Sequence, residues 1–216
     1  MSLSKLVDFS SQLHQLIIAH NRIDNINSAR CLSRSLKSHT CINHLDLSHC
    51  DLGSTPEILS VILQSDVEHI YLDNNNIDSL GAVKIAEYLE SDPPIKFLSL
   101  DHNRLDDDDA VLISQALKKN TNLHRINLHS NNFTSIGVKA LLTCVFDGSS
   151  LNAISESNHT LESLMLFWYS GQNCRFNLVL IGCFNWTKHR ELCLHCKTKI
   201  HYSNILQMYP WNLCQR

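Results

Sequence analysis

One eleven-residue pattern recurs six times along the chain, and it constrains the fold more than any other feature. The pattern reads L-x-x-L-x-L-x-x-N-x-L, with other apolar residues replacing leucine in some copies. The copies are LHQLIIAHNRI (13–23), INHLDLSHCDL (42–52), VEHIYLDNNNI (67–77), IKFLSLDHNRL (95–105), LHRINLHSNNF (123–133) and a worn copy, LESLMLFWYSG (161–171). Apolar and polar residues alternate in the middle of each copy, as in a short strand with one buried face. Successive copies begin 29, 25, 28, 28 and 38 residues apart, so the pattern predicts one strand in each repeating unit.

The segments between the copies have the apolar period of a helix. Two of these segments carry apolar residues at i, i+3, i+4 and i+7, namely Ala82, Ile85, Ala86 and Leu89, and Val138, Leu141, Leu142 and Val145. This spacing places the four residues of each set on one face of a helix. We therefore expect each unit to be a strand followed by a helix.

The ninth position of the pattern holds a polar residue at the point where the chain leaves the strand. It is occupied by Asn21, Asn75, Asn103 and Asn131, with Cys50 in the second copy and Tyr169 in the last. An asparagine side chain offers both a donor and an acceptor, so it can satisfy backbone groups at this turn. The tyrosine in the last copy indicates that the regular coils end there.

The repeated pattern resembles the leucine-rich repeat, and units of about 28 residues with a full helix are similar to its ribonuclease-inhibitor-like subclass. The resemblance implies an α/β solenoid with parallel strands on a concave face and helices on a convex face. We divide the chain accordingly. Residues 1–12 are a partial N-terminal repeat or cap, residues 13–170 hold about six leucine-rich repeats, and residues 171–216 are an irregular, Cys-rich, basic tail.

Four consecutive aspartates, Asp106 to Asp109, precede a helical run that ends in Lys118 and Lys119. Acidic residues at the start of a helix and basic residues at its end complement the helix dipole, each contributing roughly 0.3–1 kcal/mol. A calcium loop of the EF-hand type does not fit, because the sixth position counted from Asp101 is Asp106 and not glycine. The run predicts a helix start, with weak cation binding as the alternative.

The second, third, fifth, seventh and eighth positions of each copy are expected to face a partner from the concave side. Aromatic and arginine side chains on such a surface are the usual anchors of protein–protein contacts, although strands also tolerate aromatic residues for structural reasons. The candidate partner-binding residues are His44, Asp46, His49, His69, Tyr71, Asp73, Phe97, Asp101, His102, Arg125, Asn127 and His129.

Histidine is concentrated at these positions, which hold eight of the thirteen histidines: His14, His20, His44, His49, His69, His102, His124 and His129. Three of them, His20, His49 and His102, share the eighth position, so we expect them to lie roughly 5–10 Å apart along neighbouring strands. Three interpretations stay open. Histidine is a tolerated polar surface residue, or the face gains charge near pH 6–6.5, or paired imidazoles hold a transition metal.

The tail differs from the repeats in charge and in cysteine content. Residues 171–216 carry 6 Lys and Arg against 1 Asp and Glu, whereas residues 1–170 carry 12 against 20. The tail also holds five of the nine cysteines, and Cys193, Cys196 and His201 are weak candidates for zinc ligands. A cap over the last coil and a degenerate chain end are the other interpretations.

The sequence favours a binding module over an enzyme. It contains none of the phosphate-cradling, metalloprotease or nucleophile-elbow motifs, and a regular repeat face lacks the deep pocket that catalysis uses. The resemblance implies an interaction module with a protein partner, and we expect no cofactor. A regulator of a small GTPase and a zinc-dependent regulatory protein are the alternatives.

Location and partner class follow from charge and hydropathy. The N-terminus lacks the apolar run of a signal peptide, and the longest apolar run, FNLVLIGCF at 176–184, is about half a membrane span. We therefore expect a cytoplasmic protein with no membrane span. The net charge of -3 gives no reason to expect nucleic acid as a partner.

Overall fold

The structure is a computed structural model and describes residues 13–39, 41–145, 147, 149–170 and 174–181. Two compact units, Met1–Gly182 and Cys183–Arg216, divide the chain, and all described residues belong to the first. Seven strands form one sheet in chain order, with β1 to β6 parallel and β7 antiparallel. The strands are β1 (Gln15–Ile17), β2 (His44–Asp46), β3 (His69–Tyr71), β4 (Phe97–Ser99), β5 (Arg125–Asn127), β6 (Ser163–Ser170) and β7 (Cys174–Ile181).

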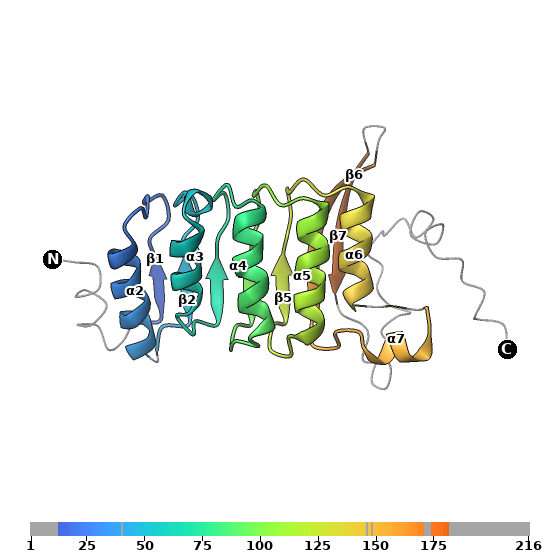
Figure 1. Cartoon of the computed structure of the whole chain (residues 1–216), viewed down its shortest axis with the longest axis horizontal. Coiled ribbons are helices and arrows are strands. Elements are labelled where there is room, and N and C mark those ends of the chain that lie inside the picture. The colour runs from blue at the N-terminus through green and yellow to red at the C-terminus, as the bar shows by residue number, and fades with distance from the viewer. Residues whose placement is uncertain (1–12, 40, 146, 148, 171–173, 182–216) are drawn as a thin grey trace. The chain divides into compact units, whose positions relative to one another are not determined.

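The helices form a layer on one side of this sheet (Figure 1). They are α2 (Ile26–Ser38), α3 (Pro56–Leu63), α4 (Ser79–Glu90), α5 (Asp107–Lys119), α6 (Ser135–Val145) and the short α7 (Leu151–Ser155), with a 3-10 helix, η1 (Leu52–Ser54), before α3. From α2 to α6, each helix packs against the next one along the chain. The predicted α/β solenoid of parallel strands alternating with helices is confirmed.

The core lies between the sheet and the helix layer and is built from the apolar positions of the pattern. The fourth position is in register from strand to strand, so Leu45, Ile70 and Leu98 are neighbours, and all three are fully buried. Ile85 and Leu89 of α4 are fully buried as well. Burying one such side chain stabilises the fold by about 1.5–3 kcal/mol, so repetition of the pattern gives every coil its own share of the core.

The ninth-position asparagines connect each coil to the one before it. Asn103 Oδ1 accepts hydrogen bonds from the backbone N–H groups of Asn75 (3.1 Å) and Ile77 (3.0 Å), and its Nδ2 donates to the carbonyl oxygens of Leu72 (3.0 Å) and Asp101 (3.3 Å). Asn103 is only 6% exposed. The predicted role of this position is confirmed, and one side chain satisfies four buried backbone groups.

The same bonds recur in the coils on either side. Asn75 Oδ1 accepts from the N–H groups of Cys50 and Leu52, and Asn131 Oδ1 accepts from that of Leu105. Cys50 retains part of the role, because its Sγ donates to the carbonyl oxygen of Ile18 at 3.4 Å. We call Asn75, Asn103 and Asn131 the asparagine ladder.

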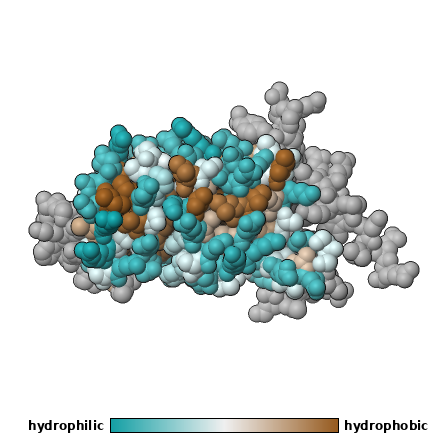
Figure 2. Space-filling model, viewed as in Figure 1, coloured by the Kyte–Doolittle hydropathy of each residue, from teal (hydrophilic) through white to brown (hydrophobic). Residues whose placement is uncertain are grey.

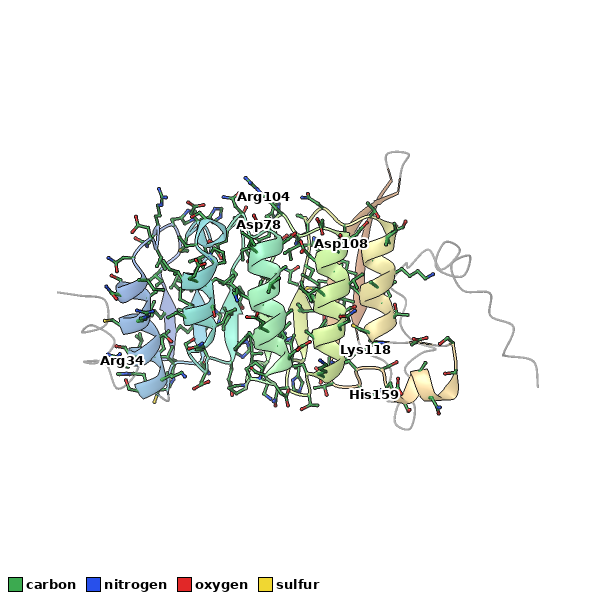
Figure 3. The ribbon with its side chains drawn as sticks, in the orientation of Figure 1. Arg34, Asp78, Arg104, Asp108, Lys118 and His159 are labelled. Atoms are coloured by element: carbon green, nitrogen blue, oxygen red, sulfur yellow. The ribbon has the colours of Figure 1, made fainter. Side chains whose placement is uncertain are left out.

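The aspartate run begins α5, as predicted. Asp106 is the N-cap, and its Oδ1 accepts from the N–H groups of Asp108 (3.0 Å) and Asp109 (3.1 Å), while Asp109 Oδ2 accepts from the N–H of Asp106 (2.9 Å). Figure 3 shows Asp108 at the N-terminal end of this helix and Lys118 toward its other end. The charges thus complement the helix dipole.

Two of the aspartates also bond to the neighbouring coils, which the sequence does not predict. Asp107 accepts from the N–H and the Oγ1 hydroxyl of Thr134 (2.8 and 2.5 Å) and from the N–H of Gly137 (2.9 Å). A side chain at Gly137 would collide with Asp107 Oδ1 and would displace this carboxylate. On the other side, Asp109 Oδ2 accepts from Ser79 Oγ at 3.2 Å. The run therefore joins three successive coils.

The parallel repeat ends at the last copy, as the tyrosine at its ninth position predicts. The backbone of β6 stays extended through Tyr169 to Ser170, where earlier copies have already turned out of a three-residue strand. β7 then pairs antiparallel with all of β6. Residues 174–181, which the sequence assigns to an irregular tail, thus form a regular strand.

Candidate functional site

Five of the candidate partner-binding residues lie together on the side of the sheet that faces away from the helices, which we call the sheet face. Tyr71 is central, with its ring centroid 4.6 Å from that of His44 and 5.0 Å from that of Phe97. His69 lies 6.1 Å from His44 and 6.3 Å from Phe97, and the Arg125 guanidinium lies 5.4 Å from the Phe97 ring centroid. We call these five residues the ring cluster.

Strand register explains why the ring cluster forms. His44, His69, Phe97 and Arg125 occupy the third position of consecutive copies, and the parallel pairing places them side by side in that order. Tyr71 takes the fifth position of the third copy, so it fills the space between His44 and Phe97 on the same face. Neighbouring aromatic rings stabilise one another by about 0.5–1.5 kcal/mol beyond their buried area.

Burial changes the pKa values of two members of the ring cluster. Partial burial, followed by the nearby His44 and Arg125, lowers the pKa of His69 below its usual 6.5 despite the opposing charge of Glu68. Burial raises the pKa of Tyr71, opposed by Arg125 and reinforced by Asp73 and Asp46. Both shifts favour the neutral form, so His69 and Tyr71 are uncharged at neutral pH.

Three candidate carboxylates, Asp46, Asp73 and Asp101, lie beside the ring cluster, and we call them the acidic row. Asp73 Oδ1 accepts from Ser99 Oγ (2.5 Å) and from the N–H of Asp101 (2.8 Å). Asp46 Oδ1 accepts from both the N–H (2.9 Å) and the Oγ (2.6 Å) of Ser48. Burial raises the pKa of Asp73, and the charges of Asp101 and Asp46 add to this, against the two hydrogen bonds. The serines hold these carboxylates in place, a role that the candidate set leaves out.

The eighth position is left-handed in five consecutive copies. The φ angles are 61° at His20, 59° at His49, 55° at Asn74, 52° at His102 and 49° at Ser130. Histidine and asparagine are among the side chains enriched in this conformation. The histidines of this position, including the candidates His49 and His102, thus meet a backbone requirement of the turn.

Two further face histidines bond to backbone carbonyls. His14 Nδ1 lies 3.1 Å from the carbonyl oxygen of Cys41, and His124 Nδ1 lies 2.8 Å from that of Asn122. With the three at the eighth position, five of the eight face histidines have a structural explanation. The hypothesis of a pH-dependent face stays a prediction.

The predicted proximity of the eighth-position histidines holds for the first pair. The rings of His20 and His49 are stacked with centroids 4.2 Å apart, closer than the expected 5–10 Å. His102 is separated from them by Asn74 in the third copy, and its Nδ1 lies 2.9 Å from Asp101 Oδ1.

The last two candidates lie at β5, beyond Arg125. Asn127 Nδ2 donates to Ser99 Oγ at 3.1 Å, and its Oδ1 accepts from the N–H of His129. The carbonyl oxygen of His129 in turn accepts from the N–H of His102. Asn127 is thus connected through Ser99 to the acidic row.

Of the two metal hypotheses, only the one on the face histidines concerns residues that the structure describes. Among residues 13–39, 41–145, 147, 149–170 and 174–181, no three His, Cys, Asp or Glu side chains are grouped so that they could hold a metal ion. The zinc candidates Cys193, Cys196 and His201 lie outside the described residues.

Within the described part of the chain, no helix has the length and apolar character needed to cross a membrane.

Comparison with known proteins gives one family match. The model of the Leucine Rich repeat family matches residues 38–55 and 119–142, which contain strands β2 and β5. No curated protein sequence matches the chain. The solved structures that are similar to it include the following two. Leiomodin-1 Actin-Binding Site 2 is 15% identical, with 79% of this chain and 78% of that chain covered and a TM-score of 0.43. The tropomodulin C-terminal domain of Caenorhabditis elegans is 14% identical, with 73% and 75% covered and a TM-score of 0.40.

The family match and the geometry agree on the repeating unit. Both matched segments contain a strand of the eleven-residue pattern and the start of the chain's turn toward the next helix. The parallel strands, the alternating helices and the asparagine ladder extend the same unit from copy to copy. The chain thus has the α/β architecture of a leucine-rich-repeat solenoid, and two of its segments match the model of that family.

Proposed function

We propose that the chain is a non-catalytic interaction module that binds a protein partner on its sheet face, the predicted concave face. One observation carries this proposal: the ring cluster gathers two aromatic residues, two histidines and an arginine on the side of the sheet that faces away from the described helices. Tyr and Arg are among the residues that most often dominate binding energies at interfaces. We also assign the repeats to the ribonuclease-inhibitor-like subclass, because α2, α4 and α5 have 12 or 13 residues.

The ring cluster has features that suit binding better than packing. Its rings are partly exposed, and their contacts are with each other, so they lie ordered before any partner arrives. Ordering a side chain in advance reduces the entropy that binding would otherwise cost, about 0.5–1.5 kcal/mol for each immobilised side chain. Such a preorganised aromatic surface favours a partner with complementary apolar or cationic groups.

The helix layer is the competing surface. Figure 2 shows apolar residues among the hydrophilic ones on this side of the molecule. Four large apolar side chains are exposed there, Leu80 and Val83 on α4, Val111 on α5 and Ile136 on α6. Single exposed apolar residues are common on soluble proteins, and the ring and cation–π contacts of the described residues all lie outside α4, α5 and α6. We therefore favour the sheet face.

The test is a capture experiment from cell lysate, read by mass spectrometry, with the whole chain as bait. The double variant Tyr71→Ala/Phe97→Ala removes the centre of the ring cluster and leaves the buried core residues unchanged. The matched control is Leu80→Ala/Ile136→Ala, which removes two exposed apolar side chains from the helix layer. Circular dichroism establishes that all three proteins are folded.

We expect a specific partner to be captured by the wild type and the helix-layer control, and to be lost with the sheet-face variant. Truncation of a central interface residue typically costs 2 kcal/mol or more, roughly a thirtyfold loss of affinity. A partner that the sheet-face variant retains and the control loses would move the binding surface to the helices and refute the proposal.

A further inference from the structure

Within the described residues, no lysine or arginine forms an ion pair with the acidic row, and this bears on the chemistry of the partner. The five ion pairs among those residues are Arg22–Asp51, Lys37–Asp66, Lys84–Glu87, His102–Asp101 and Lys119–Glu90. None joins a lysine or arginine to the acidic row. Asp46 and Asp73 direct one oxygen, Oδ1, into the bonds with Ser48, Ser99 and Asp101, and Oδ2 of each accepts no recorded hydrogen bond.

Tyr71 neighbours both of these residues in the strand register. It is the strand-pairing partner of Asp46 across β2 and β3, and Asp73 follows it by two residues on its own chain segment. After burial, the charge of Arg125 has the largest influence on the pKa of Tyr71 and lowers it, and the charges of Asp73 and Asp46 come next and raise it, in agreement with this proximity. An aromatic face and two carboxylates thus border one patch of the sheet face.

We propose that the partner presents an arginine side chain to this patch, with its guanidinium against the Tyr71 ring and its N–H groups directed to Asp46 and Asp73. This inference rests on the proposed function and adds the partner's chemistry to it. The carboxylates alone would not select a ligand. The ring does, because the negative face of an aromatic ring and a carboxylate both attract a cation and both repel an anion.

The sheet face already contains one contact of this kind. The Arg125 guanidinium lies over Phe97 at 5.4 Å, on the far side of the ring cluster from Asp46. Arginine fits the patch better than lysine, since its planar group stacks on a ring while its fork of donors reaches carboxylate oxygens. A metal ion fits less well, because the described residues hold no group of three candidate ligands.

The charge of the patch supports a cationic ligand. Burial is the largest cause of the raised pKa of Asp73, and the negative charges of Asp101 and Asp46 raise it further. A guanidinium placed between them relieves that repulsion and gains hydrogen bonds to charged acceptors, the stronger kind. Binding of a cationic segment should therefore weaken as salt increases.

The probe is a random-peptide phage library, selected on the folded whole chain in low salt. The strongest peptide is then synthesised in three forms, with its arginine kept, replaced by lysine, or replaced by the neutral isostere citrulline. Each form is titrated against the wild type and three variants. These are Asp46→Asn/Asp73→Asn, Tyr71→Ala/Phe97→Ala and the control Asp108→Asn.

Two of the variants each remove one feature of the proposed site, the carboxylate charges or the rings, and the third is a control. Asparagine keeps an Oδ1 acceptor for the Ser48, Ser99 and Asp101 bonds, so the first variant removes charge with little change of structure. Asp108 is an exposed aspartate on the helix layer and accepts no recorded side-chain hydrogen bond. Its change to asparagine alters the net charge of the chain without touching the sheet face.

We expect the selected peptides to share an arginine at one position. Citrulline in that position, and the Asp46→Asn/Asp73→Asn variant, should each raise Kd by about tenfold or more. Lysine should cost less than citrulline, and Asp108→Asn should change Kd by less than about twofold. Citrulline and the asparagine variant together should cost little more than either alone, because they remove the same interaction.

The other outcomes separate this inference from the proposed function. Peptides without a shared cationic residue that still lose binding on Tyr71→Ala/Phe97→Ala overturn the arginine inference and leave the proposed sheet-face function standing. Peptides that bind this variant as well as the wild type overturn both. An empty selection also overturns the inference, because it requires that a short arginine-containing segment be sufficient for binding.

Discussion

The asparagine ladder and the sheet face both carry polar side chains that recur with every coil. They differ in the hydrogen-bond partners of these side chains and in how much the residue type varies. Asn75, Asn103 and Asn131 bond to backbone groups of the coil before them, and their residue type hardly varies. The third position of the sheet face changes in nearly every copy, from Gln15 to His44, His69, Phe97, Arg125 and Ser163. The polar residues that repeat unchanged thus hold the coils together, whereas the residues of the sheet face vary from copy to copy.

The largest expected effect is on the ladder. Asn103→Ala would leave the N–H groups of Asn75 and Ile77 and the carbonyls of Leu72 and Asp101 without this partner in the interior. An unsatisfied buried polar group costs about 1–3 kcal/mol, and partial relaxation reduces the sum. We expect the free energy of unfolding, measured by urea denaturation, to fall by about 3 kcal/mol.

Asn127→Ala provides the matched comparison, because it removes the same side chain from the sheet face. Asn127 is partly exposed and bonds to Ser99 Oγ and the N–H of His129. Water can replace these partners, so we expect a loss of about 1 kcal/mol or less. Equal losses from the two asparagines would contradict the distinction between ladder and sheet face.

The aspartate run gives the second prediction. Asp107→Ala removes the acceptor for Thr134 and Gly137 of the next coil, whereas Asp108→Ala removes only an exposed charge at the helix start. We expect Asp107→Ala to lower the free energy of unfolding by about 1.5 kcal/mol and Asp108→Ala by about 0.5 kcal/mol. Urea denaturation at neutral pH measures both.

The pH dependence of the Asp107 contribution has a definite sign. Desolvation alone would raise the pKa of Asp107, but the hydrogen bonds from Thr134 and Gly137 outweigh it and lower the pKa below its usual 3.8. An acid with a lowered folded-state pKa stabilises the fold above its unfolded pKa and loses that effect as pH falls. The difference between wild type and Asp107→Ala should therefore be greatest at neutral pH and shrink below about pH 4. A difference that grows on acidification would show that the bonds do not favour the carboxylate.

The third prediction concerns the ring cluster. Tyr71→Ala removes ring contacts with His44 and Phe97 from a partly exposed site. We expect it to lower the free energy of unfolding by about 1 kcal/mol, much less than Asn103→Ala. A double-mutant cycle with Phe97→Ala should give a coupling of about 0.5–1.5 kcal/mol. Zero coupling would mean that the two rings are neighbours without stabilising each other.

The repeat made most of the fold predictable from sequence. Alternation around Leu98 indicated a strand, the spacing of Ile85 and Leu89 indicated a helix, and the ninth-position asparagines indicated their backbone role. These inferences depend on local patterns that recur, so each copy tests the others. The strand β7 carries no copy of the pattern, and its pairing depends on contact with β6 alone.

The candidate site was predictable in part. The repeat register placed His44, His69 and Phe97 in one row, but it could not give the angles at which their rings meet Tyr71. The left-handed backbone at the eighth position was also missed, although its occupants are mostly histidine and asparagine, a usable signal. The bonds of Asp107 to the next coil have no sequence signal, since they depend on how closely two helices approach.

The smallest expected effect is a shift in the pKa of His69, on the sheet face. Burial is the largest cause of its lowered pKa, followed by the positive potential of His44 and then, after the opposing Glu68, that of Arg125. A base with a lowered folded-state pKa binds its proton first in the unfolded chain, so its contribution to stability decreases as pH falls below 6.5. We expect NMR titration of the His69 ring to give a midpoint below 6.5, and His44→Asn to move it upward. His102→Asn, a change on the same face at a residue paired with Asp101, should leave the midpoint unchanged. A midpoint above 6.5 would mean that neighbouring carboxylates outweigh burial, and the His69 ring would then be cationic at a pH where we expect it to be neutral.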